Sequence, residues 1–96
     1  MKSEDYIEIT EICTYYKVEQ HFIEQLRDSG FLELVVIQQK DYLPYRFIPK
    51  FEKLRRLHYE LDINLEGLEA IETLLEKVEE LQETNRKLKN RLSLYE

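Results

Sequence analysis

Apolar residues in the last third of the chain recur in alternating steps of three and four. These positions, which we call the heptad face, are Ile71, Leu74, Val78, Leu81, Asn85, Leu88, Leu92 and Tyr95. The spacing is the a/d pattern of a coiled coil, with one polar member at Asn85. It predicts a long helix that pairs with a second helix. An amphipathic helix that folds back on its own domain is the alternative interpretation.

The charges along this predicted helix are sorted by position. Residues 66–83 contain seven glutamates and one lysine, whereas residues 84–96 contain four basic residues and one glutamate. A parallel pair would place the acidic halves side by side, and an antiparallel pair would place each acidic half against a basic half. Asparagine at an a position is, by contrast, typical of parallel dimers. Because of the charges we expect a homodimer through an antiparallel coiled coil.

Full antiparallel overlap defines a register. It sets Ile71 opposite Tyr95, Leu74 opposite Leu92, Val78 opposite Leu88 and Leu81 opposite Asn85. Asn85 would then have no asparagine partner, and its amide would need water or a backbone group.

The first 30 residues show the pattern of two short helices after a strand. Residues 6–9 alternate and predict a short strand or an extended lead-in. Thr10 is the expected N-cap of a helix over residues 11–16 that turns Ile12 and Cys13 inward. After a tight turn at Val18, the stripe of Phe22, Ile23 and Leu26 predicts a second helix over residues 19–29. Gly30 is placed to end it.

The middle of the chain predicts a hairpin and a third helix. Residues 34–37 are apolar and largely β-branched, residues 38–41 are turn-like, and Pro44 limits residues 42–47 to an edge strand. Pro49 is suited to the start of a helix. The inward stripe expected for this helix is Phe51, Leu54, Leu57, His58 and Leu61. Residues 62–64 break it, and Asn64 is the expected cap of the final helix.

Composition narrows the class of protein. The chain has 96 residues, a net charge of −6, two glycines, two prolines and one cysteine. Few helix breakers favour a mostly helical fold, and the acidic balance argues against a surface that neutralises phosphates. One cysteine excludes an internal disulfide. No signal peptide or apolar run of membrane-spanning length is recognisable, so we expect a cytoplasmic protein and no membrane partner.

No catalytic or metal-binding constellation is recognisable in the sequence. His21 and His58 are 37 residues apart and have no companion at ligand spacing. Cys13 has no positive or resolving partner nearby in sequence and is interpreted as a small buried residue. No glycine-rich phosphate loop is present, and no nucleophile has a base close in sequence. We therefore expect neither a cofactor nor a metal, and no enzymatic activity.

Taken together, these elements resemble the MerR superfamily of winged helix-turn-helix proteins. Val18, Ile23 and the run Gly30-Phe31-Leu32 follow that family's turn, second helix and helix-ending glycine. The resemblance implies a mostly α fold with a small β-hairpin wing, divided into a domain over residues 1–63 and a dimerisation helix over residues 64–96. DNA-binding members offer arginine and tyrosine from the second helix, whereas this chain has Glu24 and Asp28 there.

Several runs resemble one family more closely, the chaperone modulatory protein CbpM. They are residues 9–13 (ITEIC), 60–68 (ELDINLEGL) and 83–92 (ETNRKLKNRL). The wing is the least similar part. The resemblance implies a protein that binds the J-domain of a DnaJ-like (CbpA-type) co-chaperone and restrains it. A J-domain engages Hsp70 through a basic helix and a His-Pro-Asp loop, and an acidic protein that covers this surface would block the encounter.

The candidate contacts for such a partner are acidic and aromatic. The acids, which we call the acidic face, are Glu8, Glu11, Glu19, Glu24 and Asp28, and the aromatic anchors are Tyr15 and Tyr16. Each acid has an ordinary interpretation as a solvated side chain, and each tyrosine as a packing residue. A MerR-type DNA-binding transcriptional regulator is the main alternative, and Tyr42, Tyr45 and Phe47 would then be candidates to stack on bases. A purely structural dimerisation module is a third.

Overall fold

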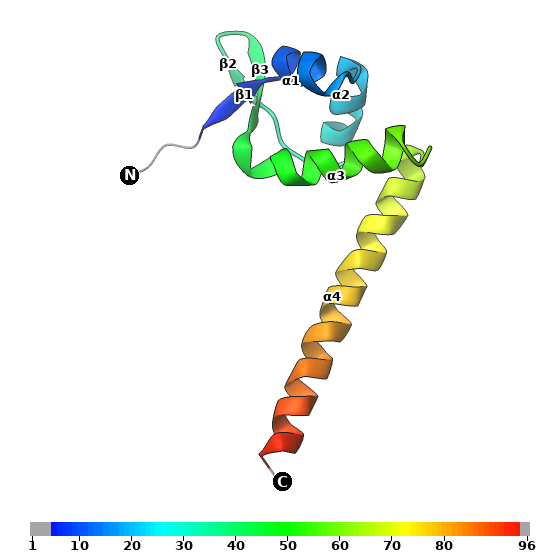
Figure 1. Cartoon of the computed structure of the whole chain (residues 1–96). Coiled ribbons are helices and arrows are strands. Elements are labelled where there is room, and N and C mark those ends of the chain that lie inside the picture. Colours follow the sequence, from blue (N-terminus) through cyan, green and yellow to red (C-terminus); the bar gives the residue numbers. More distant parts are fainter. Residues whose placement is uncertain (1–4, 95–96) are drawn as a thin grey trace. The chain divides into compact units, whose positions relative to one another are not determined.

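The computed structural model describes residues 5–94 and contains two compact units, Met1–Leu65 and Glu66–Glu96. The elements of the first unit are β1 (Tyr6–Glu8), α1 (Ile9–Tyr16), α2 (Gln20–Asp28), β2 (Val35–Ile37), β3 (Lys40–Pro44), the 3-10 helix η1 (Tyr45–Phe47) and α3 (Ile48–Tyr59) (Figure 1). The long helix α4 (Leu65–Ser93) makes up nearly all of the second. The mostly helical fold with a small sheet and a long terminal helix confirms the fold class predicted from the sequence.

Helix α1 begins earlier than the sequence predicted. Its first residue is Ile9, and Glu8 at the N-cap position makes no side-chain capping bond. Thr10 as the N-cap was therefore wrong: the helix starts two residues sooner than predicted, and Ile9 and Ile12 are buried on its inner side. Lys17 ends α1 in the left-handed conformation (φ 57°), and the Val18 amide donates to the Cys13 carbonyl at 3.1 Å.

Helix α2 follows the expected pattern closely. Phe22, Ile23 and Leu26 are all buried. After the helix, Gly30 has a φ of +83°, and the Phe31 amide donates to the Leu26 carbonyl at 3.0 Å, which satisfies a carbonyl of the last turn. Space exists for a Cβ at Gly30, so the positive φ is what favours glycine there.

The three described strands form one antiparallel sheet in the order β1-β3-β2. Strand β3 is therefore central, and the prediction of an edge strand was wrong. Tyr42 pairs with Glu8 on one side and Val35 on the other, whereas Leu43 and Pro44 pair only with β1. Pro44 ends the strand beyond the last β2 partner, so its missing amide costs no ladder bond on that side.

A tight turn joins β2 and β3. Gln38 and Gln39 both have positive φ values, 50° and 67°, as a two-residue hairpin turn requires. Residues 45–47, which the sequence analysis included in a strand, form η1 instead. The sharp turn that η1 makes leads directly into α3, with Pro49 in its first turn.

Helix α3 is the last element of the first unit. Phe51 and Leu54 are buried and Leu57 and His58 half-buried, as predicted, but Leu61 lies beyond the helix end and is 64% exposed. Its inclusion in the inward stripe was wrong because the chain leaves the helical path before Asp62, whose φ is 56°.

Aromatic rings join the three helices of this unit. The ring of Phe51 lies 5.2 Å from that of Tyr16 on α1 and 6.4 Å from that of Phe22 on α2. Phe22 also stacks on His58 at 4.6 Å. The Nδ1 of His58 is 2.8 Å from the Ile63 carbonyl oxygen, which can only accept, so Nδ1 carries the proton and donates. His58 is thus a packing and loop-fixing residue.

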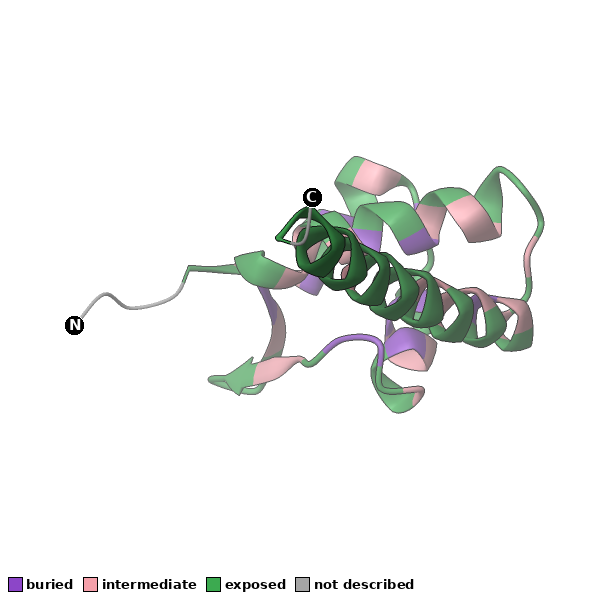
Figure 2. Ribbon diagram, turned by 90° about the horizontal axis from the view of Figure 1, so that it is seen from below, coloured by how far each residue is buried: buried purple, intermediate pink, exposed green. Residues whose placement is uncertain are grey.

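Helix α4 differs from the helices before it because most of its residues are exposed (Figure 2). Leu74, Val78, Leu81, Leu88 and Leu92 of the heptad face are between 46% and 69% exposed. Ile71 is half-buried and Asn85 exposed, while Tyr95 lies outside the described residues. Arg86 and Glu83 form an ion pair where the acidic and basic halves of the helix meet.

Candidate partner-binding surfaces

The exposed charges of α2 are not those of a typical DNA-reading helix. Glu24 is half-buried and lies 3.4 Å from the Gln20 side-chain nitrogen. Asp28, one turn further on, accepts from the guanidinium of Arg27 at 3.0 Å. Arg27 is the only arginine or lysine of α2, so the helix offers a phosphate no cation without a neighbouring carboxylate.

The hairpin and the segments beside it repeat this arrangement. Lys40 at the start of β3 lies 3.8 Å from Glu8, and Arg46 on η1 lies 3.3 Å from Glu33. Exposed pairs of this kind add little stability. They do change the local field, because Arg27, Lys40 and Arg46 each stand beside an acid. A phosphate that approached them would also meet the carboxylates.

The amino end of α2 is occupied by another part of the same domain. The Glu19 backbone amide donates to the Tyr59 hydroxyl of α3 at 3.3 Å. Backbone amides at helix amino ends are common phosphate ligands in proteins. Here one of those donors already has an internal acceptor.

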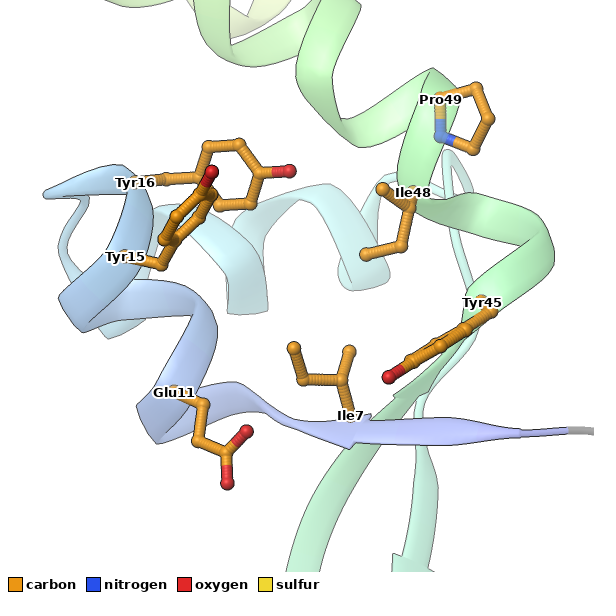
Figure 3. A pocket seen from close by; sticks show the side chains of 7 residues that line it. All are labelled: Ile7, Glu11, Tyr15, Tyr16, Tyr45, Ile48 and Pro49. Atoms are coloured by element: carbon orange, nitrogen blue, oxygen red, sulfur yellow. The ribbon is translucent and has the colours of Figure 1, made fainter.

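A groove lies on another part of the domain, between β1, α1 and the η1–α3 segment (Figure 3). Its volume is about 600 Å³. The residues that line it, which we call the tyrosine groove, are Ile7, Glu11, Tyr15, Tyr16, Tyr45, Ile48 and Pro49. Tyr15 is 77% exposed and Tyr45 51% exposed, so two large rings border an opening that is mostly apolar.

Tyr16 lines the tyrosine groove and also packs against the core of the domain. Besides its contact with Phe51, its hydroxyl donates to Glu52 at 2.7 Å. Burial, the hydrogen bond to the Glu52 carboxylate and the negative charge of that carboxylate together raise the pKa of Tyr16 to about 12. The ring is therefore a fixed, uncharged surface at neutral pH.

A second cavity adjoins the tyrosine groove. Its volume is about 360 Å³, and the residues that line it, which we call the arginine pocket, are Tyr16, Pro49, Glu52, Arg55 and Arg56. The Arg55 guanidinium lies over the Tyr16 ring at 5.7 Å. Its Nε is buried and has no hydrogen-bond partner among the described residues.

Cys13 lies beside α2, on the inner part of α1. Burial raises the pKa of its thiol, a backbone hydrogen bond lowers it, and the nearby Glu24 carboxylate raises it again. The thiol is half-buried rather than fully buried as the sequence analysis expected. A raised pKa keeps it protonated and poorly nucleophilic.

The candidate residues from the sequence therefore fall into separate places. Glu11, Tyr15 and Tyr16 come together at the tyrosine groove, whereas Glu24 and Asp28 share one side of α2. Glu8 is engaged with Lys40, and Glu19 precedes α2.

Sequence reasoning missed the other contributors to these surfaces. They are Ile7, Tyr45, Ile48, Pro49, Arg55 and Arg56. Two adjacent arginines near exposed aromatics are a signal that could have drawn attention to Arg55 and Arg56.

Two further properties concern the described residues as a whole. No cluster of three or more histidine, cysteine, aspartate or glutamate side chains suited to a metal ion occurs among residues 5–94. None of the helices in the same range combines the length and apolarity needed to cross a membrane.

Two short helices joined by a tight turn, a hairpin wing and a following helix define a winged helix-turn-helix domain. The chain matches the family model of MerR HTH family regulatory proteins over residues 7–90, and it belongs to that family. No characterised protein and no solved structure is significantly similar to it.

Proposed function

We propose that this MerR-family chain is a cytoplasmic, non-enzymatic regulator that binds the J-domain of a DnaJ-like co-chaperone and inhibits it. The observation that carries the proposal is the pairing of cations on the helix-turn-helix and wing: Arg27, Lys40 and Arg46 each stand beside a carboxylate. At these three positions the positive charge that phosphate binding needs is balanced by a neighbouring acid. The resemblance of the chain to the CbpM family supplies the partner.

The physical role of the acidic face is to attract a basic partner. Glu24 and Asp28 lie one turn apart on α2, so both can face one surface of a bound protein. Complementary charge mainly raises the association rate and disfavours wrong partners. A J-domain whose basic helix is covered in this way could not engage Hsp70.

Dimerisation through the heptad face is part of the same proposal. Five apolar side chains of that face are about half or more exposed in the single chain. A second copy of α4 would cover them, and the sorted charges favour antiparallel pairing.

The experiment that tests the partner is calorimetry of the full chain against a purified J-domain. Changing Glu24→Lys and Asp28→Lys together should weaken binding about tenfold or more, since an attractive pair of charges becomes repulsive. Glu60→Lys with Glu69→Lys makes the same change in net charge at exposed positions outside α2 and is the matched control. Unaltered affinity in the α2 variant would remove the acidic face from the mechanism.

A DNA-binding transcriptional regulator remains the second candidate, because the matching family model is one of helix-turn-helix regulators. It predicts a gel shift with duplex DNA that weakens steeply as salt rises. We expect no such shift, and a salt-sensitive one would favour this candidate.

A further inference from the structure

The tyrosine groove exposes two aromatic rings of the domain. Tyr15 and Tyr45 stand exposed on either side of an opening floored by Ile7 and Ile48, whereas Phe22 and Phe51 are buried in the core (Figure 3). Tyr15 also meets Tyr16 edge to face, with ring centres 4.9 Å apart, so the wall is preformed. Exposed apolar hollows with aromatic rims are typical of protein–protein contacts.

Charge is distributed unevenly around this opening. The tyrosine groove and the arginine pocket share Tyr16 and Pro49, so they form one continuous surface. Glu11 lies on the β1 side of it, while Arg55 and Arg56 lie on the α3 side. Glu52 lines the pocket beside this arginine pair, and its carboxylate already accepts a hydrogen bond from the Tyr16 hydroxyl.

We propose that these two cavities form a single docking site for a protein segment that places an apolar side chain between a basic residue and a carboxylate. The apolar side chain fills the tyrosine groove, the basic residue faces Glu11, and the carboxylate reaches Arg55 and Arg56. Arg55 and Arg56 both line the arginine pocket, and a guanidinium forms a charge-assisted hydrogen bond with a carboxylate. The proposal rests on the proposed function, and the J-domain is the partner that supplies the segment.

Charge argues against the other occupants of such a groove. A nucleic acid strand would bring phosphates past Glu11 and Glu52 as well as past the arginines. A purely apolar ligand would match neither the negative charge of Glu11 nor the positive charge of Arg56. A segment of mixed charge satisfies both sides, and tyrosine and arginine are the side chains that most often dominate binding energy at such surfaces.

The test is calorimetry of the full chain against a purified J-domain, with circular dichroism of each variant as the fold control. Tyr15→Ala combined with Tyr45→Ala should weaken binding about tenfold or more. Tyr6→Ala is the control, because Tyr6 is an exposed tyrosine of β1 but points to the opposite side from Ile7 and does not line the groove.

The charged half of the site has its own pair of variants. Arg56→Glu should weaken binding by about tenfold, because a carboxylate of the partner would meet a like charge. Lys53→Glu makes the same charge change on the same helix outside the pocket and should leave affinity within about twofold.

The outcomes separate this inference from the proposed function. Weakening by the groove and Arg56 variants, with both controls unaffected, supports it. Binding that depends on Glu24 and Asp28 but not on the groove overturns the inference and leaves the proposed function standing. Failure of the unmodified chain to bind a J-domain overturns both. If light scattering shows that the groove variants change the dimer instead, the occupant is a second copy of the chain and the inference is wrong.

Discussion

The helix-turn-helix domain and α4 use the same kinds of apolar side chain in opposite ways. Within the domain, Phe22, Leu26 and Phe51 are at most 3% exposed, whereas Leu74, Leu81 and Leu92 on α4 are at least 60% exposed. The domain completes its core within one chain. Helix α4 carries an apolar face that one chain leaves open. The spacing of apolar residues already separates the two cases, because the long 3–4 alternation of α4 matches a coiled coil and the short stripes of α2 and α3 match packing on a domain.

The largest effect should come from emptying the domain core. Phe51→Ala removes a ring that contacts both Tyr16 and Phe22, and it should lower the free energy of unfolding by about 3–5 kcal/mol. Urea denaturation followed by circular dichroism measures this. Val36→Ala, at an exposed position of β2, is the control and should cost well under 1 kcal/mol. A small loss for Phe51→Ala would mean that the Phe51 ring contributes little to the stability of the domain core.

The next effect concerns α4. Leu81→Asp places a charge in the middle of the heptad face and should weaken dimerisation about a hundredfold, or ~2.7 kcal/mol, while the domain stays folded. Size-exclusion chromatography with light scattering over a dilution series measures it. Asn90→Asp adds the same charge on the side of the helix away from the heptad face and should leave the dimer intact. A Leu81→Asp variant that still dimerises would place the interface elsewhere.

The smallest effect is at the boundary between core and surface, at Tyr16. Its pKa of about 12 exceeds the ordinary value of 10.0, so the folded state favours the neutral phenol. The resulting stability is fully present below pH 10 and is lost as the pH rises through 12. Tyr16→Phe should therefore lower the free energy of unfolding by about 1 kcal/mol at pH 8, and the difference from the unmodified chain should shrink between pH 10 and 12.

Urea denaturation across this pH range measures the difference. Glu52→Gln retains an acceptor for the hydroxyl but removes the negative charge, so its pH dependence should be weaker than that of the unmodified chain. If the free energy of unfolding changed with pH in the same way for the unmodified chain and for Tyr16→Phe up to pH 12, Tyr16 would not be the source of the pH dependence.

Local patterns in the sequence predicted the helices well. The stripe of α2, the glycine that follows it and the break before α4 all depend on residues within one or two turns of each other. The central position of β3 was not predicted, because Tyr6 and Pro44 pair although they are 38 positions apart in the sequence, and no local rule fixes such a pairing. Thr10 failed as a cap for a related reason, since the strand before it and the burial of Ile9 set where the helix starts.

The candidate sites likewise differ in whether their residues are close together in the sequence. Glu24 and Asp28 could be paired from the sequence because they lie four residues apart on one helix. The tyrosine groove could not be predicted from the sequence, because it joins Ile7, Tyr15 and Tyr45 from three separate elements. Its geometry depends on η1, where the sequence suggested a continuing strand.

The distribution of the aromatic rings over the described residues has a spectroscopic consequence. All aromatic residues within residues 5–94 lie between Tyr6 and Tyr59, α4 contains none, and the chain has no tryptophan. Near-ultraviolet circular dichroism, which reports fixed packing of rings, will therefore follow the helix-turn-helix domain. The far-ultraviolet helical signal will include a large share from the 29 residues of α4. One unlabelled sample thus gives two optical readings, so melting of α4 can be distinguished from melting of the helix-turn-helix domain.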